Sequence, residues 1–146
     1  IVDSAQSKDY HIDLVELNPE FCKVLHERFG DNKNVHIHSA NILDWHTSEP
    51  YDIIISTLPF NIFSKQFIQN IFDKYKGMLT EDGYMSYVEL GFFRHVGPLF
   101  MRGERKKKQL EKIKLVHTIR DTYLDETVLI RRNIPHIYVH HLRLNK

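Results

Sequence analysis

Apolar and polar residues in this chain follow two periods, one typical of strands and one typical of helices. The clearest strand pattern is the unbroken run of Ile53, Ile54 and Ile55. Such a β-branched run predicts a strand covered on both faces, as in a parallel α/β sheet. The run ends in Ser-Thr-Leu-Pro-Phe-Asn, where Pro59 removes a backbone donor and stops sheet pairing. We therefore expect the chain to turn within residues 56–61, which we call the lip segment.

The other periodic segments predict alternating strands and helices. Asn18 and Pro19 are typical of a helix start, Gly30 of a helix end, and Ser64 of a second helix start. In chain order the prediction is a helix tail at 1–7, a strand at 12–17, a helix from Pro19 to Gly30, strands at 34–38 and 51–55, a helix at 65–79, a turn at 80–83, a strand at 83–90, an irregular stretch at 92–101, a helix at 104–116, and strands at 126–134 and 137–144. This order predicts an α/β fold in one domain, residues 1–146, with a mostly parallel sheet and a C-terminal antiparallel hairpin.

Composition and charge exclude some classes of protein without selecting a function. The net charge is only +1, so any basic surface must be local. The one cysteine, Cys22, excludes an internal disulfide, and its place in a predicted helix suggests a buried, unreactive thiol. The ten histidines lack HExxH spacing, so we expect no metal site. No apolar run approaches the ~18 residues of a membrane span and no signal peptide is visible, so we expect a cytoplasmic protein.

Polar residues follow two predicted strands at the edge where α/β sheets bind ligands. Glu16 closes the first strand, and a carboxylate there can accept hydrogen bonds from both hydroxyls of a ribose. A surface acid near a strand end would give the same pattern. Asn41 follows the next strand, and its amide can accept from an adenine amino group, donate to a ring nitrogen, or form an Asx turn. Their order along the chain, with the lip segment after the third strand, is the informative feature.

Three stretches resemble the successive motifs of class I S-adenosylmethionine-dependent methyltransferases, namely residues 14–21, 39–44 and 52–60. Within the last stretch, Leu-Pro-Phe-Asn-Ile is similar to the NLPYN-I signature of the ribosomal RNA adenine dimethyltransferases. Thr57, however, stands where those enzymes carry the Asn that holds the adenine amino group. The lip resembles more strongly that of the bacterial phospholipid N-methyltransferases, which read S-x-LP here.

Three further stretches resemble the phospholipid N-methyltransferases: residues 83–89, the basic residues 102–108, and the tail 133–143. The tail is similar to that family's N-(L/I)-P-x-x-x-V-x-H-L-R ending. The resemblance implies transfer of methyl groups from S-adenosylmethionine to an amine nitrogen, that of phosphatidylethanolamine or a related phospholipid. Two other interpretations stay open: an rRNA adenine N6-methyltransferase, and a methyltransferase-like domain that binds a partner without catalysis.

The resemblance also assigns residues to two sites. Phe60 would place its ring face against a developing cation, whereas Tyr87 and Glu89 are equally well explained as a core aromatic and a rim acid. The residues implied for S-adenosylmethionine are Glu16, Leu17, Asn41, Ile42 and Ser56. The residues implied for the acceptor and its deprotonation are Ser56, Thr57, Leu58, Pro59, Phe60, Tyr87 and Glu89.

One motif of the methyltransferase family has no counterpart in the sequence. Its first strand leads into a Gly-rich loop of the G-x-G-x-G type, where glycines let the backbone approach the methionine moiety closely. None of the six glycines here is arranged that way. We therefore expect an N-terminally truncated methyltransferase whose sheet is divided where that strand is missing. The 146-residue chain alone is expected to bind S-adenosylmethionine weakly or not at all and to be inactive.

The segment that begins at Arg102 and ends at Lys114 holds seven basic and two acidic residues. With Leu110, Ile113 and Val116 on one side, a helix here could lie on an anionic membrane surface, where each basic residue contributes ~1 kcal/mol. The same charges could bind RNA phosphates or simply face solvent, but the aromatics that favour single-strand binding are absent. We expect phospholipid or an anionic membrane rather than RNA as partner, at the inner membrane face.

Overall fold

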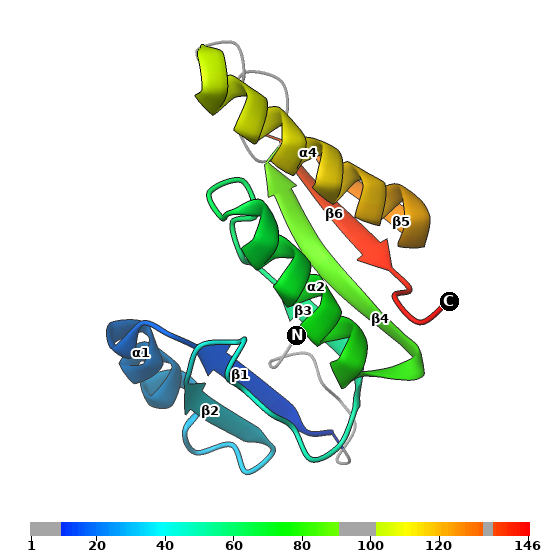
Figure 1. Ribbon diagram of the computed structural model, residues 1–146. Helices are drawn as coiled ribbons and strands as arrows, with labels where there is room; N and C mark the ends of the chain where they lie inside the picture. The colour runs from blue at the N-terminus through cyan, green and yellow to red at the C-terminus, as the bar shows by residue number, and fades with distance from the viewer. Residues whose placement is uncertain (1–9, 91–101, 133–135) are drawn as a thin grey trace. The chain divides into compact units, whose positions relative to one another are not determined.

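The computed structural model describes residues 10–90, 102–132 and 136–146 (Figure 1). The predictions for 1–7, 92–101 and the turn at Pro135 fall outside these ranges. The chain divides into two compact units, unit 1 (Ile1–His46) and unit 2 (Thr47–Lys146). Among the described residues, each unit has its own hydrogen-bonded sheet, which agrees with the expected division of the sheet.

Unit 1 consists of β1 (Ile12–Glu16), α1 (Pro19–Phe29) and β2 (Val35–Ser39). The two strands pair in parallel, as the strand–helix–strand order requires. The helix begins where the sequence predicts, because the Asn18 side chain accepts a hydrogen bond from the Glu20 backbone N–H at 3.0 Å. Cys22 is buried as expected, and its Sγ donates to the Glu16 carbonyl at 3.4 Å. Local signals therefore account for this unit.

Unit 2 is built on a four-stranded sheet with the order β3-β4-β6-β5. β3 and β4 pair in parallel, whereas β6 pairs antiparallel with both β4 and β5. The predicted C-terminal hairpin is confirmed, and the sheet is mixed. In chain order the elements are β3 (Tyr51–Ser56), α2 (Lys65–Met78), β4 (Leu79–Leu90), α4 (Gly103–Tyr123), β5 (Leu124–Ile130) and β6 (Ile137–Leu142).

Several elements of unit 2 differ from their predicted bounds; β5, predicted at 126–134, begins at Leu124 and ends at Ile130, and residues 131 and 132 form a turn. β4 begins at Leu79, directly after α2, and includes the residues 80–83 that the sequence predicts as a turn. The pairing of β4 with β3 shifts register there, which keeps this bulged stretch within the strand. At Gly83 any side chain would lie about 3.0 Å from the Tyr51 carbonyl oxygen, so the close backbone approach requires glycine. α4 extends to Tyr123, beyond the predicted end at 116.

Both helices of unit 2 lie on the same face of its sheet (Figure 1). The α2 side chain Tyr75 bonds to Ser56 on that face, and α4 contacts Glu89, which shares it. Within unit 2, helices therefore cover only one face of β3, which differs from the prediction that both faces are covered. Ile53 and Ile55 point to the opposite face, and each is 49% exposed, because neither helix of this unit covers them.

The core of unit 2 lies between the two helices and the sheet. Ser64 caps α2 by accepting from the Phe67 N–H at 3.2 Å, and the predicted inward positions Ile68 and Ile71 are fully buried. The other end of α2 is held by a distant residue. Asn145 Nδ2 lies 3.3 Å from the Lys76 carbonyl oxygen and within a similar distance of the two carbonyls that follow the helix, so it satisfies acceptors that a helix end leaves open.

Candidate functional site

Unit 1 brings together the two residues that the sequence assigns to ligand contact. Glu16 ends β1 opposite Ser39, the last residue of β2, and the Ala40 N–H extends the ladder by donating to the Glu16 carbonyl at 3.1 Å. Asn41 follows directly. Because the strands are parallel, Glu16 and Asn41 lie at the same carboxyl edge of this sheet, which is where α/β sheets hold ligands.

The Glu16 carboxylate has a fixed orientation. Its Oε1 accepts a hydrogen bond from the Asn18 backbone N–H at 2.7 Å, within the turn that starts α1. The described residues place no hydrogen bond on the second carboxylate oxygen. Because Asn18 also caps α1, one turn positions both the helix and the acid. Glu16 therefore presents one oxygen at the edge of the sheet, available to hydroxyl donors.

Asn41 forms the Asx turn that was one of its three predicted roles. Its Oδ1 accepts from the Leu43 N–H at 3.1 Å, and its carbonyl accepts from the Asp44 N–H at 2.9 Å. With Oδ1 occupied, the amide NH₂ group is the part of the side chain that can still donate to a ligand. Leu17 beside this edge is 68% exposed, and Ile42 is half-buried.

In unit 2, Ser56 lies beneath the lip segment rather than at its surface. The side chain is buried, and its Oγ accepts from the Tyr75 hydroxyl of α2 at 3.1 Å and from the Leu58 N–H at 3.4 Å. Burial raises the pKa of Tyr75, and its bond to Ser56 acts in the opposite direction. Thr57 and Pro59 are exposed. The chemistry that this segment can offer a ligand is therefore the Thr57 hydroxyl and backbone carbonyls.

Phe60 is a core residue in this structure. Its side chain is only 6% exposed, stacks against Phe72 with ring centroids 5.1 Å apart, and meets the edge of Tyr87 at 5.6 Å. Tyr87 is buried as well and lies opposite Ser56 in the sheet. This arrangement supports the core interpretation of Tyr87 and gives the Phe60 ring a packing role, while the direct catalytic assignments of both remain predictions.

The lip segment is also held by α4, a contact that the sequence did not reveal. The Asn61 carbonyl accepts hydrogen bonds from Lys112 Nζ at 3.1 Å and from Gln109 Nε2 at 3.4 Å. Burial lowers the pKa of Lys112. The next residue, Ile62, is 68% exposed. α4 thus supports the lip segment from residues about fifty positions away in the chain. The sequence indicates the basic composition of this helix but not its contact with the lip segment.

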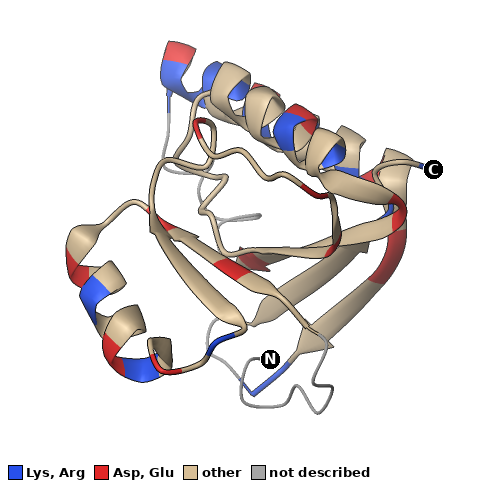
Figure 2. Cartoon of the chain, turned by 90° about the horizontal axis from the view of Figure 1, so that it is seen from below, with Lys and Arg blue, Asp and Glu red and all other residues tan. Residues whose placement is uncertain are grey.

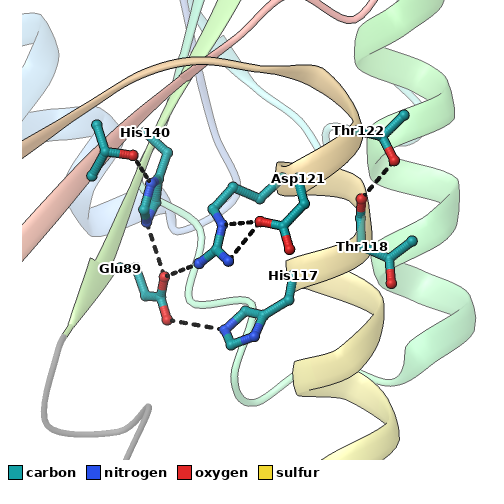
Figure 3. A network of polar contacts seen from close by, with 8 residues as sticks. Glu89, His117, Thr118, Asp121, Thr122 and His140 are labelled. Atoms are coloured by element: carbon teal, nitrogen blue, oxygen red, sulfur yellow. Dashed lines mark hydrogen bonds and ion pairs between the residues drawn. The ribbon is translucent and has the colours of Figure 1, made fainter.

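Glu89 lies at the centre of a polar network near the end of β4 (Figure 3). Its carboxylate is 2.9 Å from His140 Nε2 on β6, and His140 Nδ1 is 2.9 Å from Thr127 Oγ1 on β5. Two α4 side chains approach the same carboxylate: His117 Nε2 lies 3.8 Å from Glu89 Oε1, and Arg120 Nη1 lies 3.9 Å from Glu89 Oε2. The printed partners of Glu89 come from β6 and α4, and β5 contributes Thr127 through its bond to His140; no spacing in the sequence indicates these contacts. The network holds the Glu89 carboxylate between β6 and α4.

The basic residues of the predicted partner segment lie along the first half of α4 (Figure 2). Residues 102–108 are all exposed, and Leu110 is also largely exposed. No helix in the described ranges is both long and apolar enough to cross a membrane. Over the same ranges, no cluster of three or more His, Cys, Asp or Glu side chains could hold a metal ion.

The chain matches no protein-family model and no curated protein sequence. Solved structures do match. The N-methyltransferase NodS from Bradyrhizobium japonicum superposes with a TM-score of 0.65 and 13% identity, over 90% of this chain and 72% of NodS. An S-adenosylmethionine-dependent methyltransferase from Clostridium acetobutylicum superposes with a TM-score of 0.63 and 14% identity, over 93% of this chain and 76% of that enzyme. An rRNA methylase from Streptococcus thermophilus superposes with a TM-score of 0.58 and 12% identity, over 90% of this chain and 72% of the methylase.

These likenesses define the fold. The chain has the α/β Rossmann-like fold of class I S-adenosylmethionine-dependent methyltransferases, with a mixture of parallel and antiparallel strands. The predicted fold class is confirmed. NodS has also been solved with S-adenosyl-l-homocysteine, in a structure of which this chain covers 65% at 12% identity. At such identities the likeness shows the fold alone.

Proposed function

We propose that this chain carries ligand-binding and acceptor residues of an S-adenosylmethionine-dependent N-methyltransferase whose acceptor is a phospholipid amine. The observation that carries the proposal is the oriented Glu16 carboxylate at the carboxyl edge of a methyltransferase-type sheet. In folds of this kind an acid at that place accepts from ribose hydroxyls. The N-methyltransferase NodS, which has this fold, binds S-adenosyl-l-homocysteine.

The residues of unit 1 fit the nucleoside part of S-adenosylmethionine. Glu16 offers the ribose a carboxylate oxygen that no described residue occupies, and Asn41 offers an N–H donor to a ring nitrogen. Exposed Leu17 and half-buried Ile42 provide apolar surface for the adenine ring. When bound, S-adenosylmethionine supplies an electrophilic sulfonium methyl group. Removing the negative charge of Glu16 should therefore weaken binding without disturbing the fold.

The lip segment is the proposed acceptor site. An amine must be neutral before it can attack, so the site must take up a proton from the ammonium form and hold the nitrogen in line. The Thr57 hydroxyl and the carbonyls of Ser56 and Leu58 are suited to orient the amine, because carbonyl oxygens accept N–H bonds. Glu89 is the proposed proton acceptor. Phe60 keeps this segment in place through its ring contacts.

Features around the lip segment support a lipid acceptor. Ile62 is exposed next to Asn61, whose carbonyl is bound by Lys112 of the basic helix α4. An exposed apolar side chain beside clustered Lys and Arg is the combination that binds anionic membrane surfaces peripherally. The α4 charges would then meet lipid phosphates while the amine of the same headgroup reaches the lip segment.

An rRNA adenine methyltransferase is the second candidate. Its support is the likeness to the rRNA methylase from Streptococcus thermophilus and the basic α4, whose charges also suit phosphates of RNA. Thr57 argues against it, because the adenine dimethyltransferases that the lip resembles carry an Asn at this place.

The test follows labelled methyl groups from S-adenosylmethionine to phosphatidylethanolamine vesicles and, separately, to unmodified ribosomal RNA, using the natural full-length protein. Label in lipid alone is the expected result. Label in RNA alone would replace the lipid proposal with the second candidate, and no label in either would remove both.

A binding measurement isolates the cofactor part of the proposal. Glu16→Gln should weaken S-adenosylmethionine binding by about 10- to 100-fold, since hydrogen bonds to a charged group contribute about 1.5–3 kcal/mol. Glu20→Gln is the matched control, because Glu20 is exposed in the first turn of α1 and pairs only with Lys23 in the described residues. Equal affinities of the two variants in titration calorimetry would remove Glu16 from the site.

A further inference from the structure

The strand β5 forms an edge of the unit 2 sheet within the described part of the chain. It pairs with β6 on one side only, and all seven of its residues are exposed. Val128, Leu129 and Ile130 are each about 40% exposed, although they are large and apolar. An edge strand with open backbone groups and apolar side chains is a template for pairing with another strand.

Opposite charges lie on the two sides of the apolar residues of β5, with Asp125 and Glu126 inside the strand and Arg131 and Arg132 in the turn that directly follows it. The sequence from 125 to 132 reads Asp-Glu-Thr-Val-Leu-Ile-Arg-Arg, acidic at the start and basic at the end. Asp125 Oδ1 lies 3.5 Å from Arg143 Nε. Glu126, Arg131 and Arg132 form no ion pair within the described ranges. Read in the opposite direction, the charge pattern is its own complement. A second copy of this chain, lying antiparallel, therefore presents arginines to acids at both ends.

The geometry of an antiparallel pair fixes which residues can meet. Outward-facing backbone groups alternate along a strand, so a two-fold pairing places residues of equal parity opposite each other. A two-fold axis at Leu129 places Val128 opposite Ile130 and brings Glu126 towards Arg132, which lies in the turn that follows the partner copy's strand. Shifting the axis by one residue to Val128 leaves Glu126 diagonal to Arg132, still on the same face. The Leu129 register joins apolar with apolar residues and acid with base, whereas the Val128 register places Glu126 directly opposite Ile130, so the Leu129 register is favoured.

We propose that two copies of this chain associate through β5, with the strands antiparallel around a two-fold axis and the two unit 2 sheets joined edge to edge. The interface is isologous, so each favourable contact occurs twice. The backbone groups of the open edge find partners, and the exposed Val128, Leu129 and Ile130 are covered by the same residues of the partner copy. The charged ends select the antiparallel arrangement over the parallel one, which would place like charges together.

Two charge-reversed chains test this proposal in the natural protein. In Glu126→Lys the new lysine faces Arg132, and in Arg132→Glu the new glutamate faces Glu126, so each variant alone opposes like charges twice. A mixture of the two variants restores opposite charges at both ends. Sedimentation equilibrium should show a concentration-dependent dimer for the natural protein, self-association weakened about tenfold or more in each variant, and a dimer containing both variants in the mixture.

Each outcome of this experiment decides the proposal. A natural protein that stays monomeric up to millimolar concentration overturns it, as does a dimer that both variants retain unchanged. Because both side chains are exposed, each variant should unfold at the same temperature as the natural protein, which separates weaker association from damaged folding. Cross-linking through Leu129→Cys gives a second readout: a disulfide-linked dimer is expected, and its loss in Glu126→Lys supports the register, whereas its persistence there contradicts it.

Discussion

The two units differ in how they hold their candidate functional groups. In unit 1, Glu16 and Asn41 are oriented by backbone N–H groups two residues further along the chain, and only Cys22 and Val35 are buried apolar residues among those described. In unit 2 the lip segment is hydrogen-bonded by side chains of α2 and α4 that lie between 19 and 51 residues away, and Phe60 packs against Phe72 of α2. The candidate groups of unit 1 are thus placed by local turns, whereas the lip segment depends on contacts with distant elements.

The largest test of this difference is a pair of Phe→Ala substitutions. Phe60→Ala should lower the free energy of unfolding by about 3–5 kcal/mol, because it leaves a cavity against Phe72 and Tyr87. Phe21→Ala is the counterpart in unit 1, where the side chain is 59% exposed, and its effect should stay within about 0.5 kcal/mol. Urea unfolding monitored by circular dichroism measures both. Similar losses would show that the lip segment is no more dependent on packing than α1.

A smaller effect is expected where the lip segment meets α2. Tyr75→Phe removes the hydroxyl that donates to Ser56, and should cost about 1–3 kcal/mol because the buried serine loses one of its two hydrogen-bond partners. Tyr138→Phe is the control, since the Tyr138 hydroxyl makes no hydrogen bond among the described residues. Equal unfolding free energies for the two variants at neutral pH would contradict a supporting role for Tyr75.

The same variant has a predictable pH dependence. Burial raises the pKa of Tyr75, so the folded chain keeps this phenol protonated when the unfolded chain releases the proton, near its ordinary pKa of about 10. The contribution of this group to stability is complete below that pH and is lost as pH rises through the raised pKa. Unfolding measured from pH 8 to about pH 11 should show this alkaline loss in the natural protein, and less of it in Tyr75→Phe.

The smallest effect is expected at the contact between α4 and the lip segment. Lys112→Met removes a hydrogen bond to the Asn61 carbonyl and should cost about 1 kcal/mol or less, since burial already penalises the ammonium. The exposed Lys106→Met serves as control. Because burial lowers the pKa of Lys112, stability should rise with pH as the ordinary lysine pKa of about 10.4 is approached. A Lys112→Met chain that retains this rise would exclude Lys112 as its source.

Local signals in the sequence predicted most of the fold. The Asn18 and Ser64 caps, the order of strands and helices, and the antiparallel pairing of β5 with β6 were all visible, because each depends on residues near in sequence or on simple periodicity. The β3 isoleucines led to a prediction of coverage on both faces that unit 2 does not show, for a related reason. Their pattern shows that a strand is apolar, but which face a helix covers depends on both α2 and α4 lying on the same side.

The candidate site was predictable only in part. Glu16 and Asn41 could be placed at one edge because parallel strands end together. The Ser56–Tyr75 hydrogen bond and the contacts of Glu89 with His140 and α4 join residues far apart in the chain. No spacing in the sequence therefore predicts these contacts. These contacts depend on the register of the sheet and the path of the helices.

The hydrogen bonds from Asn145 to the carbonyls at the end of α2 have a consequence for the order in which unit 2 folds during synthesis. A ribosome releases the chain from its N-terminal side, so α2 and β4 emerge well before the residue that satisfies the Lys76 carbonyl. β6, which completes the pairing of β4, also emerges late. Until residues 137–145 leave the exit tunnel, nascent unit 2 exposes one side of β4, and a chaperone that binds unpaired strands would find its target there during this interval.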